Sequence, residues 1–290
     1  MEGTKIMKYA ITAATGRFGI IAVNYLTKQI DPKDIVIIAR NFKKAQKLFP
    51  NLTIRTGNYD RPNEISKALS NIDRVLFISS TVDGGEITRL EQHKNVVSAL
   101  KRNHVSYVAY TSFTHAQNSK SSLANDHKFT ENLITDSKIS HSFLRNNWYL
   151  ENETNFFKIG KDKKKAIYWT ANRAGWALER EYAEAAVKVL INKDAKEIYE
   201  FSGSAHTYED LGLALNQVLN YKCDIIRVTK ENYIKYLEEQ GLSHQNSEMY
   251  ASFQNIIDEG SLSDTTNDLT TVLNHPLTKL SDGIKEIIIK

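Results

Sequence analysis

The residues best suited to chemistry form a glycine-containing loop between an apolar run and an amphipathic stretch, Ala10-Ile11-Thr12-Ala13-Ala14-Thr15-Gly16-Arg17-Phe18-Gly19. A strand that turns into a helix in this way points backbone N–H groups at an anion, while Gly16 and Gly19 permit close approach of phosphate and sheet. Ala13 stands where such loops carry their first glycine, so a plain strand-to-helix connection is the alternative. The residues expected to bind a dinucleotide pyrophosphate are Thr12, Ala14, Thr15, Gly16, Arg17, Phe18 and Gly19.

Basic residues follow the second apolar run, which ends at Arg40 and is continued by Lys43 and Lys44. An acid at this place would accept hydrogen bonds from the ribose hydroxyls of NADH, whereas arginine and lysine pair with a 2′-phosphate. We therefore expect Arg40 and Lys43 to select NADPH, with NADH as the alternative cofactor. If these cations only solvate the start of a helix, that preference disappears.

Small polar residues follow three further apolar runs. They are Asn58 and Tyr59, Ser79 and Ser80, and Thr111 and Ser112. Ligands bind beyond the carboxyl ends of parallel strands, so these residues are expected to line the cofactor groove. Taken one at a time, each is equally typical of an ordinary turn.

The elements that must position these residues alternate in type up to about residue 150. The predicted strands are Tyr9–Ile11, Ile35–Ile38, Leu52–Arg55, Arg74–Ile78, Tyr107–Tyr110 and His141–Leu144, and the predicted helices are Phe18–Lys28, Phe42–Leu48, Asn63–Leu69, Glu91–Arg102 and Asn125–Thr135. This order predicts an α/β fold with a Rossmann-type, doubly wound parallel sheet. We expect a dinucleotide-binding domain over residues 6–150.

The remaining chain, residues 151–290, is expected to form a smaller mixed α/β lobe on the substrate side, interleaved with the first domain. An aromatic-rich stretch precedes further helix and strand patterns, at Arg180–Ile191, Ile198–Phe201, Tyr208–Leu219 and Asp224–Val228. The last third has mainly helical periodicity. The run Lys161–Lys165 is interpreted as a solvated loop.

Composition narrows the functional classes. The 290 residues are 41% hydrophobic and carry a formal charge of +4 without a basic arm, which disfavours a nucleic-acid partner. A single cysteine and the lack of a leader pattern favour the cytoplasm, and no apolar run is long enough to cross a membrane. Residues 1–5 form a polar extension that we leave out of the fold.

No metal site is expected, because the eight histidines show no i, i+4 pair and one cysteine offers no thiolate cluster. Only one dinucleotide loop is present, so no flavin is expected. Hydride would then pass directly from nicotinamide to a planar acceptor held by aromatic walls. Candidates for those walls are Phe113, Trp148 and Tyr149, whose alternative role is core packing.

Several segments together resemble a known family, the NmrA-like branch of atypical short-chain dehydrogenases and within it the bacterial type 2 NAD(P)H:quinone oxidoreductases. The resemblance covers nearly the whole chain. It is carried by Thr12–Gly19, Arg40-Asn41, Leu76–Ser80, Gln92–Val96, Ala109–Ser112, His115-Ala116, Leu123–His127 and Leu144–Asn152.

The resemblance implies that Asn147, Trp148 and Tyr149 form a wall between nicotinamide and substrate, with Asn147 contacting the cofactor as well as the reacting atoms. Most short-chain dehydrogenases use a Tyr-x-x-x-Lys pair, and here Leu123 and His127 stand at those positions. Without the tyrosine acid, reduction of a quinone remains feasible because its hydroquinone anion is stable. His127 is a candidate proton donor or ribose ligand, and a structural hydrogen-bonding role is the alternative.

The function implied is NAD(P)H-dependent reduction of quinones or small electrophilic carbonyls, by a monomer or a homodimer. The alternative is an NmrA-like redox sensor that binds the dinucleotide without turnover.

Overall fold

The computed structural model describes residues 7–81 and 85–289. The polar extension at 1–5 and residue 6, the expected start of the first domain, lie outside these ranges. Two compact units divide the described chain. Unit 1 holds the residues up to Gln117 together with Ser122–Asn146 and Tyr182–Glu200, and unit 2 holds Asn118–Ser121, Asn147–Glu181 and the residues from Phe201 onward. The chain therefore leaves unit 1 after Asn146 and returns to it once more.

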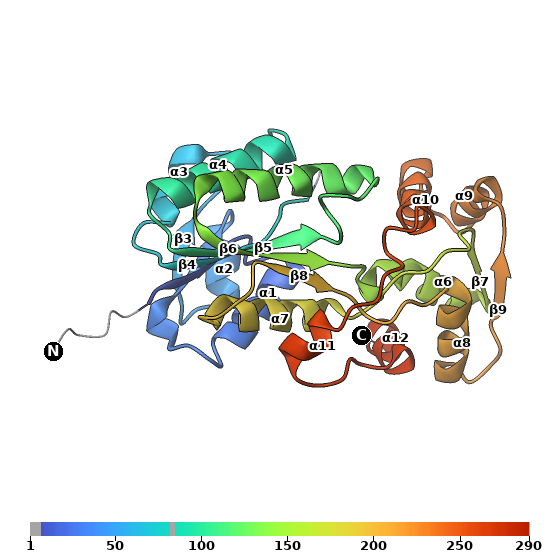
Figure 1. Ribbon diagram of the computed structural model, residues 1–290. Coiled ribbons are helices and arrows are strands. Elements are labelled where there is room, and N and C mark those ends of the chain that lie inside the picture. Colours follow the sequence, from blue (N-terminus) through green and yellow to red (C-terminus); the bar gives the residue numbers. More distant parts are fainter. Residues whose placement is uncertain (1–6, 82–84, 290) are drawn as a thin grey trace. The chain divides into compact units, whose positions relative to one another are not determined.

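Unit 1 is built on a seven-stranded sheet in the order β3-β2-β1-β4-β5-β6-β8 (Figure 1). The strands are β1 (Tyr9–Ile11), β2 (Ile35–Ala39), β3 (Thr53–Thr56), β4 (Arg74–Phe77), β5 (Tyr107–Phe113), β6 (Ser140–Asn146) and β8 (Ile198–Phe201). The pairs from β3 through β6 are parallel. This confirms the α/β class and the Rossmann-type order, with the reversal of strand order beside β1 where such folds bind ligands.

Helices cover both faces of this sheet. They are α1 (Arg17–Leu26), α2 (Phe42–Leu48), α3 (Pro62–Ala68), α4 (Arg89–Arg102), α5 (Ser122–Ser137) and α7 (Glu179–Ile191), with a short 3-10 turn η1 (Pro32–Asp34). In Figure 1, α3, α4 and α5 lie on one face and α1, α2 and α7 on the other. Because both faces are covered, β1, β2, β4 and β5 are buried throughout and read in the sequence as continuous apolar runs.

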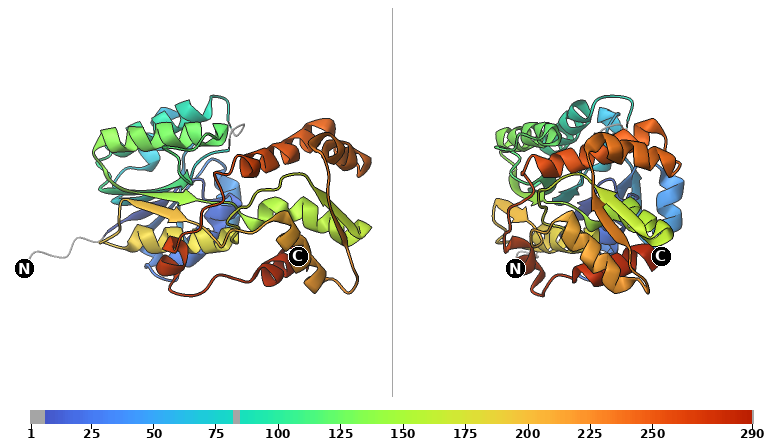
Figure 2. Two further views of the ribbon diagram at one scale, coloured as in Figure 1. Left: turned by 45° about the vertical axis from the view of Figure 1, so that its right-hand side comes forward. Right: turned by 90° about the vertical axis from the view of Figure 1, so that its right-hand side faces the viewer.

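Unit 2 contains a two-stranded parallel ribbon of β7 (Lys165–Tyr168) and β9 (Asp224–Arg227). Its other elements are η2 (Leu150–Glu153), α6 (Thr154–Lys163), α8 (Tyr208–Val218), α9 (Lys230–Glu239), α10 (His244–Asp258), α11 (Asp268–Leu273) and α12 (Leu280–Ile289). Helices α9 and α10 lie on one side of the ribbon and α8 and α12 on the other (Figure 2). Ile167 of β7, Tyr233 and Leu237 of α9 and Ala251 of α10 form the apolar cluster between ribbon and helices.

The structure differs from the sequence reading at residues 154–168. There the structure has α6 and β7. The aromatic residues of this stretch made neither the helical nor the strand periodicity recognisable. The run Lys161–Lys165 is exposed, as predicted, but it is not a loop. It ends α6, passes Lys164 in the left-handed region at φ 55°, and begins β7. Lysines are favourable at this place because a helix C-terminus carries partial negative charge.

Candidate cofactor and acceptor site

The loop between β1 and α1 has the close approach that its glycine spacing predicts. A Cβ atom on Gly19 would lie 2.6 Å from the carbonyl oxygen of Ala13 and 2.7 Å from Cα of Ala14, so only glycine fits where α1 meets the loop. Ala13, in the place of the usual first glycine, adopts φ 48°. An alanine therefore takes the left-handed backbone conformation that this turn requires, at a cost that glycine would not incur.

The N-terminus of α1 offers donors to an anion. Gly16 occupies the N-cap, no side chain caps the helix, and its first turn holds no acidic residue. Gly16 and Arg17 are exposed, whereas Thr15 is partly buried and Ala14 and Phe18 are buried. Such a start suits the pyrophosphate of a dinucleotide, because amide groups and helix dipole both favour negative charge there.

The basic group after β2 is exposed and adjoins this loop in the sheet order. Arg40, Lys43 and Lys44 are all exposed, and Asn41 caps α2 by accepting a hydrogen bond from the amide of Lys44 at 2.9 Å. Exposed cations at the end of this strand are of the kind that could hold a phosphate on the adenosine ribose.

Two of the expected cofactor ligands brace the sheet with their side chains. The hydroxyl of Tyr59 lies 2.5 Å from Oγ1 of Thr12 and 2.9 Å from the carbonyl oxygen of Ile78. Thr12 is fully buried and accepts a further bond from the amide of Ile78 at 3.1 Å. The two hydroxyls therefore hold the ends of β1 and β4 together, and burial raises the pKa of Tyr59.

The remaining expected ligands at the strand ends are partly engaged with each other. The amide of Ser79 donates to Oγ1 of Thr111 at 2.9 Å, and that of Ser80 donates to Nε2 of His93 at 3.2 Å. Asn58 forms a turn, accepting from the amide of Asp60 at 3.1 Å. Of these contacts, the one between Ser79 and Thr111 joins the ends of β4 and β5.

His127 lies inside unit 1 with both ring nitrogens bonded. Arg89 Nη2 lies 2.8 Å from Nε2, and the hydroxyl of Tyr110 lies 2.9 Å from Nδ1. A guanidinium only donates, so Nε2 accepts and Nδ1 carries the proton toward Tyr110. Burial, then Arg89 and His93, hold the pKa of His127 well below its usual value, and Phe113 stacks on its ring at 6.2 Å. The imidazole is thus neutral.

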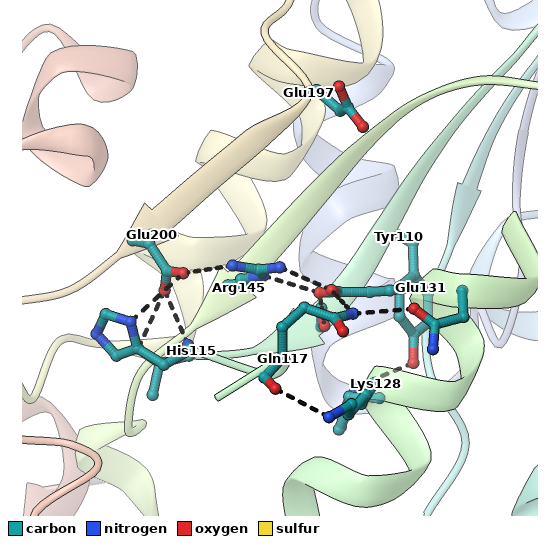
Figure 3. Close-up of polar contacts among 12 residues, drawn as sticks. Tyr110, His115, Gln117, Lys128, Glu131, Arg145, Glu197 and Glu200 are labelled. Carbon is teal, nitrogen blue, oxygen red and sulfur yellow. Dashed lines mark hydrogen bonds and ion pairs between the residues drawn. The ribbon is translucent and has the colours of Figure 1, made fainter. Parts of the chain in front are cut away.

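Next to this histidine lies a buried ionic cluster, which we call the carboxylate–arginine cluster: Glu131 of α5, Arg145 of β6 and Glu200 of β8 (Figure 3). Arg145 donates to Glu131 through Nε at 2.9 Å and Nη2 at 2.8 Å, and to Glu200 through Nη1 at 2.9 Å. The hydroxyl of Ser112 donates to Glu131 at 2.6 Å. A buried carboxylate therefore orients the hydroxyl of Ser112, which is an expected cofactor ligand.

Of the predicted acceptor residues, Asn147, Trp148 and Tyr149 belong to unit 2, and Phe113 belongs to unit 1. The side-chain amide of Asn147 donates to Oγ of Ser202 at 3.2 Å and to the carbonyl oxygen of Leu262 at 3.1 Å, and its oxygen accepts from the amide of Trp148 at 2.8 Å. Trp148 is buried and meets Phe253 edge-on at 5.6 Å. Tyr149, partly buried, bridges to the backbone at Ala177.

A buried acid in unit 2 was not anticipated from the sequence. Glu153 is 5% exposed and accepts from the indoles of Trp148 at 3.0 Å and Trp176 at 3.3 Å, and from the hydroxyl of Tyr208 at 2.6 Å. Burial raises its pKa to about 7, although the hydrogen bonds from Tyr208, Trp176 and Trp148 act in the opposite direction.

Other groups missed by the sequence reading are Arg89, Glu131, Arg145 and Glu200. One signal was available for Glu131, since it follows His127 by four residues on the buried stripe of α5. Over residues 7–81 and 85–289, no group of three or more His, Cys, Asp or Glu side chains is placed to hold a metal ion. The helices of the same ranges include none with the length and apolarity to span a membrane.

Comparison with known proteins agrees with this geometry. A family model described as NAD(P)H-binding matches residues 13–178. Quinone oxidoreductase 2 of Escherichia coli is 30% identical over 282 residues, which is 96% of this chain and 98% of the relative. An NmrA-like family domain-containing oxidoreductase of Aspergillus flavus, flvB, is 27% identical over 150 residues, 50% of this chain and 49% of its own length.

Solved structures match over nearly the whole chain. NADPH-dependent quinone oxidoreductase QOR2 of Escherichia coli, complexed with NADPH, has a TM-score of 0.89 at 30% identity and covers 97% of this chain and 99% of its own. Triphenylmethane reductase of Citrobacter sp., complexed with NADP(H), has a TM-score of 0.91 at 26% identity. The match covers 97% of this chain and 100% of the reductase chain. The chain belongs to the NAD(P)H-binding, NmrA-like family of atypical short-chain dehydrogenases that includes quinone oxidoreductase 2.

Proposed function

We propose that this protein is an NADPH-dependent oxidoreductase that reduces quinones or related planar electrophiles. The observation that carries the proposal is the pairing of an uncapped α1 N-terminus with the exposed Arg40 group one strand away. It is supported by relatives named for NADPH-dependent quinone reduction that match almost the whole chain. The single cysteine is consistent with a reducing, cytoplasmic setting.

In this proposal the residues of unit 1 bind and orient the dinucleotide. Amides at the start of α1 hold the pyrophosphate, and Arg40 and Lys43 hold the 2′-phosphate. Ser79, Ser80, Thr111 and Ser112 border the groove at the strand ends. NADPH, when bound, supplies the hydride.

The residues of unit 2 supply the acceptor side. Asn147, Trp148 and Tyr149 form the wall against which a planar acceptor stacks. A quinone needs no strong acid at its oxygen, which fits a neutral His127 whose Nε2 accepts from Arg89. His127 then positions Phe113 and Tyr110, and its direct part in proton transfer stays a prediction. Turnover unchanged in His127→Ala would remove it from the catalytic residues.

The activity is tested by following the loss of NADPH absorbance at increasing concentrations of 1,4-benzoquinone. A triphenylmethane dye serves as a second acceptor. Saturable turnover of either is the expected result. Tight NADPH binding without turnover of any acceptor would contradict the enzyme and favour a redox sensor.

Cofactor choice is tested by Arg40→Ser. Loss of a charge-assisted bond to phosphate is expected to weaken NADPH binding about tenfold and to leave NADH binding unchanged. Arg102→Ser is the matched control, because Arg102 is also exposed in unit 1 but ends α4. An equal loss for both cofactors would contradict the assignment of Arg40 to the 2′-phosphate.

A further inference from the structure

The buried carboxyl group of Glu153 has no cationic partner in the part of the chain that the structure describes. Among the described residues its hydrogen-bond partners are the indoles of Trp148 and Trp176 and the hydroxyl of Tyr208. All three are neutral donors. A structural ion pair would place a lysine or arginine here, as Arg145 is placed beside Glu131, so charge pairing does not explain this acid.

The surroundings of the carboxyl group are aromatic. Tyr208 is stacked on Tyr168 at 5.5 Å and 10° and meets Phe156 and Trp176 edge-on at 5.3 and 5.5 Å. These rings exclude water, so hydrogen bonds to the carboxyl group are strong and directional. The indole of Trp148, which borders the same group, therefore has its ring plane fixed by one oxygen, Oε1 of Glu153.

We propose that Glu153 is a positioning residue of the acceptor site, which holds the ring of Trp148 in the orientation that a planar acceptor requires. The inference rests on the proposed function, since it takes Trp148 as part of the acceptor wall. Trp176 shares Oε1 and steadies the carboxyl group from the other side. Glu153 acts through Trp148 and does not touch the substrate.

A consequence is pH dependence in the neutral range. The ionised group accepts from all three donors through charge-assisted hydrogen bonds, whereas protonation leaves the indole of Trp148 donating to a neutral and therefore weaker acceptor. The titratable groups that face it are the phenols of Tyr208 on α8 and Tyr233 on α9, and burial raises the pKa of both. Because the pKa of Glu153 is near 7, the hold on Trp148 changes between about pH 6 and 8.

The kinetic test is a double-mutant cycle of Glu153→Gln and Trp148→Phe in the full chain. In the Trp148 background, Glu153→Gln is expected to raise the KM for benzoquinone about fivefold with NADPH binding unchanged, because a neutral amide oxygen is a weaker acceptor for the indole than a carboxylate. In the Trp148→Phe background, where the side chain at position 148 cannot donate to Glu153, the same change is expected to leave KM unaltered. Equal effects in both backgrounds would overturn the proposal, since they would indicate general damage to unit 2.

Glu209→Gln is the matched control for the loss of a carboxylate. Glu209 is exposed and follows Tyr208 on α8. The KM of the Glu209→Gln variant for the quinone is therefore expected to equal that of the parent. A rise comparable to that of Glu153→Gln would overturn the proposal, because net charge alone would then explain the effect.

A spectroscopic test needs no turnover. In Trp169→Phe, emission comes only from Trp148 and Trp176, because the chain has three tryptophans. Emission is expected to change with a midpoint near pH 7, and the Glu153→Gln form of this variant is expected to show no such step. Failure of the parent to reduce any acceptor would contradict the proposed function alone. A flat titration in an active protein would contradict the inference alone.

Discussion

Two buried glutamates, Glu131 of unit 1 and Glu153 of unit 2, are held in different ways. In unit 1, Glu131 is 1% exposed and meets the guanidinium of Arg145 through two bonds, with Glu200 on the other side of the arginine. In unit 2, Glu153 is 5% exposed and accepts hydrogen bonds from two indoles and a phenol. The first carboxylate is matched by a full positive charge, and the second is not.

This difference decides which of the two carboxyl groups titrates near neutral pH. Burial alone would lower the pKa of Arg145, but its hydrogen bonds to Glu131 and Glu200 raise it above the usual value, so the cluster keeps its charges. For Glu153, burial prevails over three neutral hydrogen bonds and brings its pKa to about 7. A buried carboxyl group therefore titrates near pH 7 when its hydrogen-bond donors are uncharged rather than cationic.

The largest effect is expected from breaking the charge match in unit 1. Arg145→Met leaves Glu131 buried without a cation, which is expected to lower the free energy of unfolding by about 3–5 kcal/mol. Urea unfolding of the full chain measures it.

Its control is Arg180→Met in unit 2. Arg180 pairs with Glu286 at 2.8 Å, but the two side chains are 33% and 38% exposed, so the expected cost is only about 0–1 kcal/mol. If both variants lost the same free energy, the buried charge match would have no special importance.

The next effect is the pH dependence of stability that Glu153 confers. Its folded pKa of about 7 lies above its ordinary value of 4.5, so its contribution is fully present below about pH 4.5 and is lost as pH rises to about 7. The linked loss is about 3 kcal/mol over that window. Thermal or urea unfolding from pH 5 to pH 8 should show this slope in the parent.

In Glu153→Gln the same slope should be absent, because an amide does not titrate. Glu209→Gln, on the exposed face of α8, should keep the parental slope. An unchanged slope in Glu153→Gln would assign the pH dependence to other groups and remove the contrast between the two units.

The sheet of unit 1 could be predicted because its signals are local. Buried parallel strands read as apolar runs, and the helix from Phe42 to Leu48 was predicted with its observed bounds. The glycine loop was found because spacing and backbone geometry coincide there, and Gly19 has no room for a Cβ atom. Family membership was predicted from the same segments and is confirmed by the matching relatives.

The buried polar groups could not be predicted, because each depends on residues distant in the sequence. Arg145 and Glu200 are 55 residues apart, as are Glu153 and Tyr208. Glu153 lies in a polar stretch, Glu151-Asn152-Glu153-Thr154-Asn155, that resembles a solvated turn. Helix α6 and strand β7 were also not predicted, because aromatic side chains are compatible with both helical and strand periodicity.

A smaller effect is expected from removing one donor to Glu153. Tyr208→Phe deletes the hydroxyl that lies 2.6 Å from Oε2 and stabilises the ionised form. The midpoint of the tryptophan titration should therefore rise by about 0.5–1 pH unit. Tyr221→Phe is the control, because the hydroxyl of Tyr221 donates to the carbonyl oxygen of Lys161, away from the carboxyl group. A midpoint that stays in place would mean that the phenol does not stabilise the carboxylate.

The smallest effect is expected from Glu200→Gln in unit 1. The side chain of Glu200 is 18% exposed, and Arg145 keeps both bonds to Glu131 when Glu200 loses its charge, so the expected cost is about 1 kcal/mol. Glu131→Gln should cost more, because it removes the fully buried carboxylate that both Arg145 and Ser112 contact. Urea unfolding of the two variants decides between them. Equal losses would mean that the three side chains act as one network, in which solvent exposure of one carboxylate no longer reduces its contribution.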